Sequence, residues 1–518
     1  MEETTKNTSR PPQGADAKDL GEVIDIDEAI LRAQGCTSEL QRSFSWVGAL
    51  GLAFSIVNSW LTYAACFGVA FTYGGGSVAV FSPLLSGIVQ WIVLTGVSEL
   101  ASAFPSSGGQ YHFTYIIAPE SCRNFVAYTV GMINVVAWWV NTASGAIYTA
   151  ISAFGVCTFL LPEFSGTQWQ VYLCYLLVII LTLLPVFLVP QRQIDRLTES
   201  SMFLSLAGFG MVVIVCLVMG RGSYHPERLT EYRSASGWAP GPGWLLGIGN
   251  GEYAFAAAGA CVHIAEEIPQ PNRKIPLVIN LTILIGLLTL VPWIIAMTCV
   301  IQDVDAVQNS SLPSLELFYQ ATGSKAAAAF LQIYLTILYY SCVPSQWITS
   351  SRMTWAFSRD NGLPFSKYWS VVDEKLGIPV RTTLLSAGFC AIYGLLYIAS
   401  TQAFNSIINT AVLMLNITYV VPQGILAVRG RTRLPARYFN LGTLGYGVNV
   451  FSVLWVILSG IFFCFPTSTS PTLENMNYNS VVLTGIFAIV MLCWFERRGK
   501  FSGPNINWDA LNATQGMN

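Results

Sequence analysis

Near its middle the chain reads Trp244-Leu-Leu-Gly-Ile-Gly-Asn-Gly-Glu-Tyr-Ala-Phe-Ala-Ala-Ala-Gly-Ala-Cys-Val-His263. The stretch is apolar enough to span a membrane, but each of its glycines costs roughly 1 kcal/mol relative to alanine in a helix interior. It also holds an acid, Glu252, and an imidazole, His263, and ionisable groups at membrane depth usually face a cavity or a partner. The stretch therefore predicts a helix interrupted near the bilayer midplane, where freed backbone lines a cavity. The alternative is a curved, glycine-rich packing helix.

The composition of the whole chain is that of an integral membrane protein. Its 518 residues are 53% hydrophobic and only 10% charged, with a mean hydropathy of +0.53, whereas soluble proteins carry about 25% charged residues. No basic groove or readout motif favours a nucleic acid partner. The 12 cysteines are scattered without a CxxC pair, so we expect no metal site, no disulfide framework and no cofactor.

Apolar windows of about 20 residues, the length that crosses a hydrocarbon core, recur along the chain. They predict an all-α polytopic membrane protein with 12 transmembrane helices. The windows lie near 44–72, 78–104, 125–160, 169–189, 199–220, 243–265, 277–300, 325–350, 381–400, 404–428, 443–465 and 479–496.

The positive charges test this count, because cytoplasmic loops collect lysine and arginine. Of the 26 lysines and arginines, 22 fall in the two tails and the even-numbered loops. We therefore expect both termini to be cytoplasmic, with residues 1–42 as a disordered tail rather than a cleavable signal peptide and residues 498–518 as a second tail. We expect the membrane to be the plasma membrane, with the vacuolar membrane as the alternative.

The first apolar window carries polar residues in its middle: Ser55, Asn58 and Ser59. It lies five helices before the glycine-rich window, and two weak helices in corresponding positions of two halves indicate an inverted-repeat transporter. We therefore predict repeats at 43–220 and 221–428, followed by two further helices at 429–497. A break in the first helix frees amides that attract a carboxylate and carbonyls that attract an ammonium group. The alternative is that the polar groups bond to neighbouring helices.

Aromatic and polar residues share one face of the third window. Trp138 and Asn141 are three residues apart and so point the same way, with Tyr148 further along the span. Such a wall binds a quaternary ammonium by cation–π attraction, worth about 2 kcal/mol when desolvated. The alternative is ordinary packing or an interfacial belt.

Two further residues lie near the ends of spans. Glu99, at the cytoplasmic end of the second window, is a candidate gate residue; the alternative is that it pairs with a base such as Arg123 or bonds a freed amide. Asn309 begins the sequon Asn309-Ser-Ser311, and it falls in the seventh loop, 302–324, on the predicted outer face, where N-glycosylation is possible.

Several motifs together resemble the fungal amino acid/choline transporter family of the amino acid-polyamine-organocation (APC) superfamily. They are Gly51-Leu-Ala-Phe-Ser-Ile-Val-Asn-Ser-Trp60, Glu99-Leu-Ala-Ser-Ala-Phe-Pro-Ser-Ser-Gly-Gly-Gln-Tyr111, His263-Ile-Ala-Glu-Glu-Ile-Pro-Gln-Pro-Asn-Arg-Lys-Ile-Pro276, Ala356-Phe-Ser-Arg-Asp-Asn-Gly-Leu-Pro364 and Met476-Asn-Tyr478. The resemblance implies a five-plus-five inverted-repeat fold of the LeuT-like type with two extra helices. It also implies uptake of amino acids, GABA or choline-like amines, generally driven by protons.

By position, the resemblance places the substrate site at two breaks. The first is Ser55 to Ser59, which includes Ile56, and the second is Phe255 to Gly259, which includes Ala256. The motif from Glu266 to Pro276 is expected at the cytoplasmic end. A further set is expected in the loop after the eighth helix: Arg352, Arg359 and Asp360.

The chain departs from the superfamily pattern at the sixth helix. Many members carry an acid where this chain has Gly259, and here an acid stands seven residues earlier, at Glu252. The fifth window also lacks the mid-helix lysine of proton-coupled relatives. We therefore expect Glu252 and His263 to be the candidate proton carriers, since a buried carboxyl and an imidazole both titrate near neutral pH.

The leading interpretation is a secondary active transporter that imports an amino acid or GABA by proton symport, with Phe255 and Trp138 as lids. The alternatives are a choline, quaternary amine or polyamine transporter and, from another class, a solute-sensing receptor. No enzyme motif such as HExxH or GxSxG is present, so we expect no enzymatic activity. The expected partners are the solute, protons and the lipid bilayer, and the sequence leaves the oligomeric state open.

Overall fold

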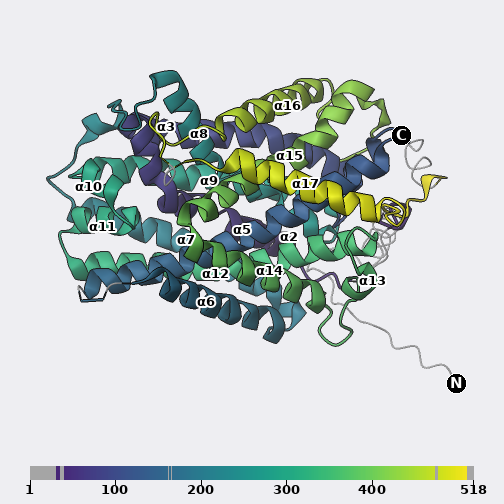
Figure 1. Ribbon diagram of the computed structural model, residues 1–518, viewed down its shortest axis with the longest axis horizontal. Coiled ribbons are helices and arrows are strands. Elements are labelled where there is room, and N and C mark those ends of the chain that lie inside the picture. The colour runs from purple at the N-terminus through teal and green to yellow at the C-terminus, as the bar shows by residue number, and fades with distance from the viewer. Residues whose placement is uncertain (1–30, 36–39, 162, 165, 473–475, 510–518) are drawn as a thin grey trace, which may run out of the picture.

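The computed structural model describes residues 31–35, 40–161, 163–164, 166–472 and 476–509, and these form helices and connecting loops (Figure 1). Within them no strand is present beyond one isolated bridge between Asp373 and Ile378, so the predicted all-α fold is confirmed. The elements are α2 (Trp46–Val57), α3 (Ser59–Ala103), α4 (Gln110–Ile117), α5 (Arg123–Leu160), α6 (Gln168–Leu188), α7 (Gln191–Met219), η1 (Pro226–Leu229), α8 (Pro240–Glu252), η2 (Ala256–Glu267), α9 (Pro271–Val300), α10 (Val304–Asn309), α11 (Pro313–Thr322), α12 (Lys325–Arg359), α13 (Ser366–Trp369), α14 (Val380–Ala399), α15 (Thr401–Arg429), η3 (Arg431–Arg433), α16 (Leu444–Phe462) and α17 (Asn479–Arg497).

Ten helical segments among the described residues are long and apolar enough to cross a membrane. Two features of the helices explain why this number is smaller than the predicted 12. The segment Trp46–Ala103 counts once, although its backbone is non-helical at Gly74 and Gly75, and the glycine-rich stretch is divided into α8 and η2. The exact number of crossings therefore stays a prediction.

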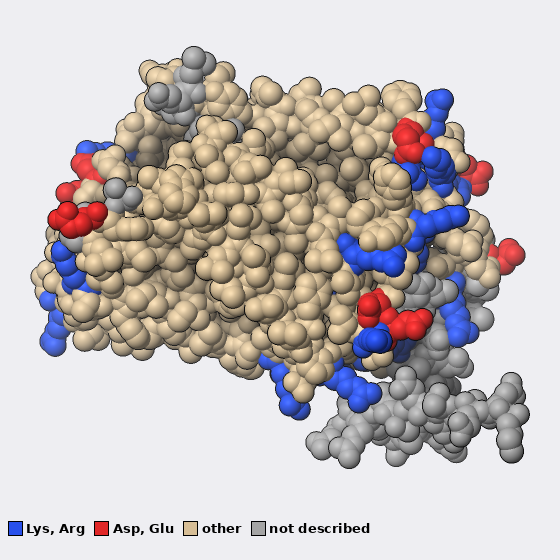
Figure 2. Space-filling model, turned by 60° about the horizontal axis from the view of Figure 1, so that its bottom comes forward, with Lys and Arg blue, Asp and Glu red and all other residues tan. Residues whose placement is uncertain are grey.

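The charged residues mark the two ends of the molecule. Figure 2 shows them gathered at both ends of the long axis, with an uncharged belt between. The end of α17 and α13 lie at one end, and α10 and α11 lie at the other (Figure 1). The backbone amide of Asn507 donates to Ala33 (2.9 Å), so the two terminal segments lie on the same face, which we call the predicted cytoplasmic face.

Two sets of helices pack most closely within themselves. In the first helix set, α3 packs on α8 and α9, and α2 packs on α9 and η2. In the second helix set, α12 packs on α5, α6 and α14. Both breaks predicted from the sequence belong to the first set, so any cavity beside them lies against the second.

Small residues allow α2 to lie directly on α7. A Cβ added at Gly51 would lie 2.7 Å from the backbone of Thr198, and backbone cannot move aside as a side chain does. The Thr198 hydroxyl donates to the carbonyl of Gly48 (2.9 Å), and Ser45 caps α2 by accepting from the amide of Gly48 (2.9 Å). The glycines therefore fix the first half of the broken helix against its neighbour.

Several expected boundaries are wrong. The helix expected at 325–350 continues to Arg359, so Arg352 and Arg359 lie in α12 rather than in the following loop; the charge of Arg352 is neutralised by a buried glutamate and does not end the helix. The expected loop 302–324 contains α10, capped by Asp303, and α11.

Part of the tail predicted to be disordered is packed. Leu31, Ala33 and Leu40 are buried, since the segment 31–35 meets the chain near Asn507. Residues 1–30 and 36–39 lie outside the described residues, as do residues 510–518 of the expected C-terminal tail. The repeat boundaries at 43–220, 221–428 and 429–497 stay predictions.

We predict that Gly51→Ala lowers the free energy of unfolding by about 1–3 kcal/mol through overpacking against α7. The measurement is the thermal unfolding midpoint of the purified protein in detergent. Gly210→Ala on α7 is the matched control, because a Cβ there meets nothing within 4 Å. An equal midpoint for the two variants would contradict the close contact.

Candidate functional site

The first break lies between α2 and α3 at Asn58. This residue has φ 32° and ψ 60°, in the left-handed region that asparagine tolerates better than most residues. Its Oδ1 accepts from the Ser205 hydroxyl (2.7 Å), which in turn accepts from the Trp60 indole N–H (3.0 Å). The break is therefore fastened to α7 by side chains, and the first turn of α3 keeps amides without helical partners.

The second break lies between α8 and η2, at residues 253–255. The α-helix ends at Glu252, and the chain resumes as a 3-10 helix at Ala256, so the break begins earlier than the predicted Phe255–Gly259. The Tyr419 hydroxyl donates to the carbonyl of Ala256 (2.9 Å). A Cβ at Gly259 would lie 2.8 Å from that hydroxyl. Tyr419 therefore leaves no room for the acid that relatives carry at this position.

A cavity of about 30 Å³ lies beside both breaks. That is space for water but not for a solute of amino acid size. The lining comes from both helix sets: Ser55, Ile56, Asn58, Leu61, Thr62, Ala65, Asn141, Ser144, Gly145, Tyr148, Tyr253, Ala257, Tyr339, Cys342 and Gln346. No charged side chain is among these described lining residues.

Three lining residues carry buried polar atoms without a hydrogen-bond partner among the described residues. They are the Ser55 hydroxyl, the Asn141 Nδ2 and the Gln346 Oε1. Buried polar groups are ordinarily paired, and these three converge on one cavity. They therefore supply one donor, one acceptor and one hydroxyl to whatever occupies it.

Three tyrosines separate the cavity from a larger space. Tyr148 lies 6.1 Å from Tyr253 and 6.4 Å from Tyr339, measured between ring centroids. All three also line a vestibule of about 370 Å³, which extends to Leu312 and Asn477 on the face opposite the predicted cytoplasmic one. The Tyr253 hydroxyl donates to Ser144 (3.0 Å) and the Tyr339 hydroxyl to the carbonyl of Leu61 (2.9 Å). The rings therefore stand between the vestibule and the cavity.

Of the predicted substrate residues, Ser55, Ile56, Asn58 and Asn141 line the cavity. Five others do not: Ser59, Trp138, Phe255, Ala256 and Gly259. The Phe255 ring lies near Gly87 and Gly286 instead, between α3 and α9. The predicted lid roles of Phe255 and Trp138 have no support in this geometry.

Trp138 and His263 contact each other. The indole N–H donates to His263 Nε2 (3.1 Å), while Nδ1 lies 3.0 Å from the carbonyl of Ser107. Because indole only donates and a carbonyl only accepts, these contacts fit the neutral imidazole with its proton on Nδ1. A second proton at Nε2 breaks the Trp138 bond, so the geometry favours a structural role for His263.

Sequence reasoning missed the contribution of α12. Tyr339, Cys342 and Gln346 recur at intervals of three and four residues and so share one helix face. On α5, Ser144, Gly145 and Tyr148 lie three, four and seven residues after Asn141, and so share its helix face toward the cavity. The sequence of α12 carries a stripe of polar and aromatic residues that could have indicated this wall of the cavity. Only the corresponding stripe of α5 was identified, through Asn141 and Tyr148.

Glu99 lies at the predicted cytoplasmic face and is buried. It pairs with Arg431 and with Arg437 (2.7 Å), and it accepts from the amide of Leu441 (3.1 Å). The expected alternative partner Arg123 pairs with Glu120 instead (2.8 Å). Glu99 therefore fastens α3 to the segment before α16, and its predicted gating role stays a prediction.

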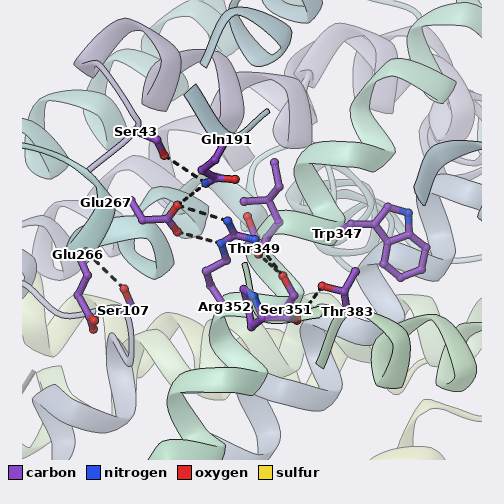
Figure 3. Close-up of polar contacts among 12 residues, drawn as sticks. Ser43, Ser107, Gln191, Glu266, Glu267, Trp347, Thr349, Ser351, Arg352 and Thr383 are labelled. Atoms are coloured by element: carbon purple, nitrogen blue, oxygen red, sulfur yellow. Dashed lines mark hydrogen bonds and ion pairs between the residues drawn. The ribbon is translucent and has the colours of Figure 1, made fainter. Parts of the chain in front are cut away.

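A fully buried ion pair joins the two helix sets at the predicted cytoplasmic face (Figure 3). Arg352 of α12 donates to both carboxylate oxygens of Glu267, from Nε (2.8 Å) and from Nη2 (3.3 Å). The Gln191 amide at the start of α7 donates to Glu267 (2.8 Å) and to the Ser43 hydroxyl (3.2 Å). The carboxylate at the end of η2 therefore joins η2 to α12 and α7, and Gln191 extends the contacts to the segment before α2.

Further polar contacts lie beside this pair. Glu266 pairs with Arg359 (3.0 Å), and Asp360 contacts His112 Nε2 (2.9 Å) and accepts from the Tyr111 hydroxyl (2.9 Å). Burial raises the pKa of the Asp360 carboxyl, but its contacts with His112, Arg359 and Tyr111 together outweigh burial, and the pKa lies below the usual range. This face is therefore closed by ion pairs, whereas the opposite face has the vestibule.

A family profile described as amino acid permease matches residues 44–487. The choline transporter of Saccharomyces cerevisiae is 30% identical over 466 residues, covering 89% of this chain and 82% of that protein. Amino-acid permease 2 of Neurospora crassa is 26% identical, covering 92% and 88%. A mutant manganese transporter of Eremococcus coleocola has a similar structure, with a TM-score of 0.55 at 14% identity, covering 91% of this chain and 95% of that one. The last likeness concerns the fold alone, and it bears out the LeuT-like architecture.

We predict that Glu267→Gln lowers the free energy of unfolding by about 3–5 kcal/mol, because it leaves Arg352 buried without its charge partner. The measurement is again the thermal midpoint in detergent. Glu227→Gln is the control, since Glu227 pairs with His225 at an exposed site, where an ion pair is worth about 0–1 kcal/mol. If both variants shifted the thermal midpoint by similar small amounts, the buried ion pair would not be a major contribution to stability.

Proposed function

Because the chain belongs to the amino acid permease family within the APC superfamily, we propose that it imports a small solute with one amine, either an amino acid or GABA. The chain is an integral multi-pass membrane protein and a secondary transporter, not an enzyme. The observation that carries the proposal is the cavity between the two breaks, with unpaired polar atoms on Ser55, Asn141 and Gln346.

The cavity has complementary groups for a zwitterion. The free amides in the first turn of α3 favour a carboxylate, and the carbonyl end of α2 favours an ammonium group. Ile56, near the end of α2, and Leu61, in the first turn of α3, both line the cavity, so these two backbone ends lie beside it. A polyamine is a poorer fit, because no acidic side chain among the described residues lines the cavity.

Choline is the second candidate, and a specific observation favours it. Three tyrosine rings border the cavity, and aromatic rings bind quaternary ammonium groups by cation–π attraction. The choline transporter of Saccharomyces cerevisiae is also among the relatives. Choline has no carboxylate for the α3 amides, so its recognition depends on the rings of Tyr148, Tyr253 and Tyr339.

The transport cycle that we propose uses a proton gradient. Solute enters from the vestibule, the three tyrosines move apart to admit it, and the ion pairs of Glu266 and Glu267 break when the opposite face opens. Import in this direction requires both termini to be cytoplasmic. The membrane that we propose is the plasma membrane, with the vacuolar membrane as the alternative.

An uptake screen tests the proposed function. Labelled amino acids, GABA, choline and spermidine are offered at two pH values to permease-deficient yeast cells that express the chain. Uptake of one amino acid, GABA or choline that increases at the lower pH supports the proposal. Binding without uptake of any solute would favour the solute-sensing receptor, and uptake of spermidine alone would contradict the neutral cavity as the substrate site.

We predict that Asn141→Leu and Gln346→Leu each raise the KM for the solute found in the screen by about tenfold, which corresponds to one lost hydrogen bond. Transport assays over a range of solute concentrations measure this, with surface expression quantified in parallel. Asn309→Gln is the control, because Asn309 is exposed at the end of α10. An unchanged KM in both cavity variants would place the site elsewhere.

A further inference from the structure

Glu252 is a fully buried carboxylate that connects four helices. It is the last residue of α8. Its Oε1 accepts from Trp455 Nε1 (2.8 Å) and the Ser459 hydroxyl (3.1 Å) of α16. Its Oε2 accepts from Asn416 Nδ2 of α15 (2.8 Å) and Gln90 Nε2 of α3 (3.4 Å). The four donors surround a group that lines neither the cavity nor the vestibule.

All four of these donors are neutral. The other deeply buried glutamates differ: Glu99 pairs with two arginines and Glu267 with one. Transferring a carboxylate from water to the protein interior costs several kcal/mol, which an opposite charge normally offsets. Glu252 has no such partner among the described residues. It can therefore take up a proton without breaking an ion pair.

The surroundings also provide an acceptor for that proton. The Oε1 of Gln90 is buried and has no hydrogen-bond partner among the described residues. Rotation of the Gln90 amide brings this oxygen to the protonated carboxyl and breaks the bond from Gln90 Nε2 to Asn416 Oδ1 (3.1 Å). The Ser459 hydroxyl can likewise reverse and accept, since a hydroxyl both donates and accepts. Both the ionised and the neutral form of Glu252 therefore have hydrogen-bond partners.

The same contacts disfavour a metal cation. Trp455 and Asn416 direct N–H groups at the carboxylate oxygens, where a cation would have to bind. Indole has no acceptor, so it cannot turn a lone pair toward a cation. A proton, which adds to one oxygen and needs no cavity, fits this arrangement better.

Other titratable groups on the packed helices are engaged elsewhere. The hydroxyls of Tyr63 on α3 and Tyr419 on α15 donate to the carbonyls of Ala79 and Ala256. The adjacent Tyr253 donates to Ser144. The charged residues of α3 and α15, Glu99 and Arg429, lie near the predicted cytoplasmic ends of their helices. Helix α16 contains no charged residue.

We propose that Glu252, held by Gln90, Asn416, Trp455 and Ser459, is the proton-binding site of the transporter and that it acts away from the solute. This inference rests on the proposed transport function. The carboxylate gains one proton and becomes a neutral carboxylic acid, and no other bond forms or breaks. Hydrogen bonds to the ionised form are the stronger ones, so protonation loosens α8 from α15 and α16.

The next residue carries this change to the cavity. Tyr253 follows Glu252 directly, lines the cavity and stands between it and the vestibule. Loosening of the end of α8 therefore frees one of the three tyrosines that must move apart when solute enters. Proton binding at Glu252 and solute binding in the cavity are therefore linked through the backbone at the end of α8.

Proteoliposomes containing the full chain test the inference, with radiolabelled GABA, choline and a mixture of amino acids as probes. Two assays are compared: counterflow exchange without a gradient, and accumulation driven by an inward proton gradient. For Glu252→Gln we expect counterflow within about threefold of wild type and at least roughly tenfold less proton-driven accumulation. Glu231→Gln, an exposed carboxylate, is the control.

The outcomes separate the two proposals. No counterflow by the wild-type chain with any probe refutes the transport function itself. Proton-driven accumulation retained by Glu252→Gln, or accumulation driven by sodium instead of protons, overturns the assignment of Glu252.

A second variant decides the case in which Glu252→Gln loses both activities. Trp455→Phe keeps the carboxyl but removes one donor to its ionised form, so the pH midpoint of transport is expected to rise by about one unit. An unchanged midpoint in that variant overturns the assignment.

Discussion

A membrane helix that stops inside the hydrocarbon leaves backbone amides and carbonyls without water, and protein must satisfy them or enclose the cavity that they line. We infer that two helices among the described residues, α2 and α8, stop in this way. Their breaks are fastened from outside, by Ser205 at Asn58 and by Tyr419 at Ala256. The cavity beside the breaks is lined by Ser55, Asn141 and Gln346, each with a buried polar atom that has no hydrogen-bond partner among the described residues. The cavity therefore follows from the need to cover two broken helices.

The polar contacts on the two sides of this cavity differ in kind. At the predicted cytoplasmic face, full charges meet across the helix sets, as in the buried pair of Glu267 and Arg352. Toward the vestibule, the described residues that line both spaces are Ala65 and the three tyrosines, and none of them is charged. Moving apart rings that make single neutral hydrogen bonds costs less than separating a buried ion pair. We therefore expect the vestibule side to open first.

The sequence predicted the breaks better than it predicted the wall opposite them. Asn58 in the first window and the clustered glycines in the sixth are each unfavourable inside an apolar helix. Each signal lies within a single short stretch of sequence, so the breaks can be predicted without knowing how the helices pack. Tyr339, Cys342 and Gln346 are ordinary in isolation, and their meaning depends on α12 lying against the first helix set. The contact between Trp138 and His263 joins residues that are far apart in the chain, so spacing alone did not reveal it. Arg352 was placed in a loop because a charge ends an apolar window, whereas Glu267 supplies the partner that keeps it in the helix.

The central claim is that the solute binds between the two broken helices, with the ion pairs of the opposite face intact. A cryo-EM structure of the full chain in a lipid nanodisc, with the transported solute at saturating concentration, tests it most directly. We predict solute density that contacts Ser55, Asn58 and Ala257 while Arg352 remains on Glu267. Density confined to the vestibule, or an empty cavity with solute bound elsewhere, would contradict this account.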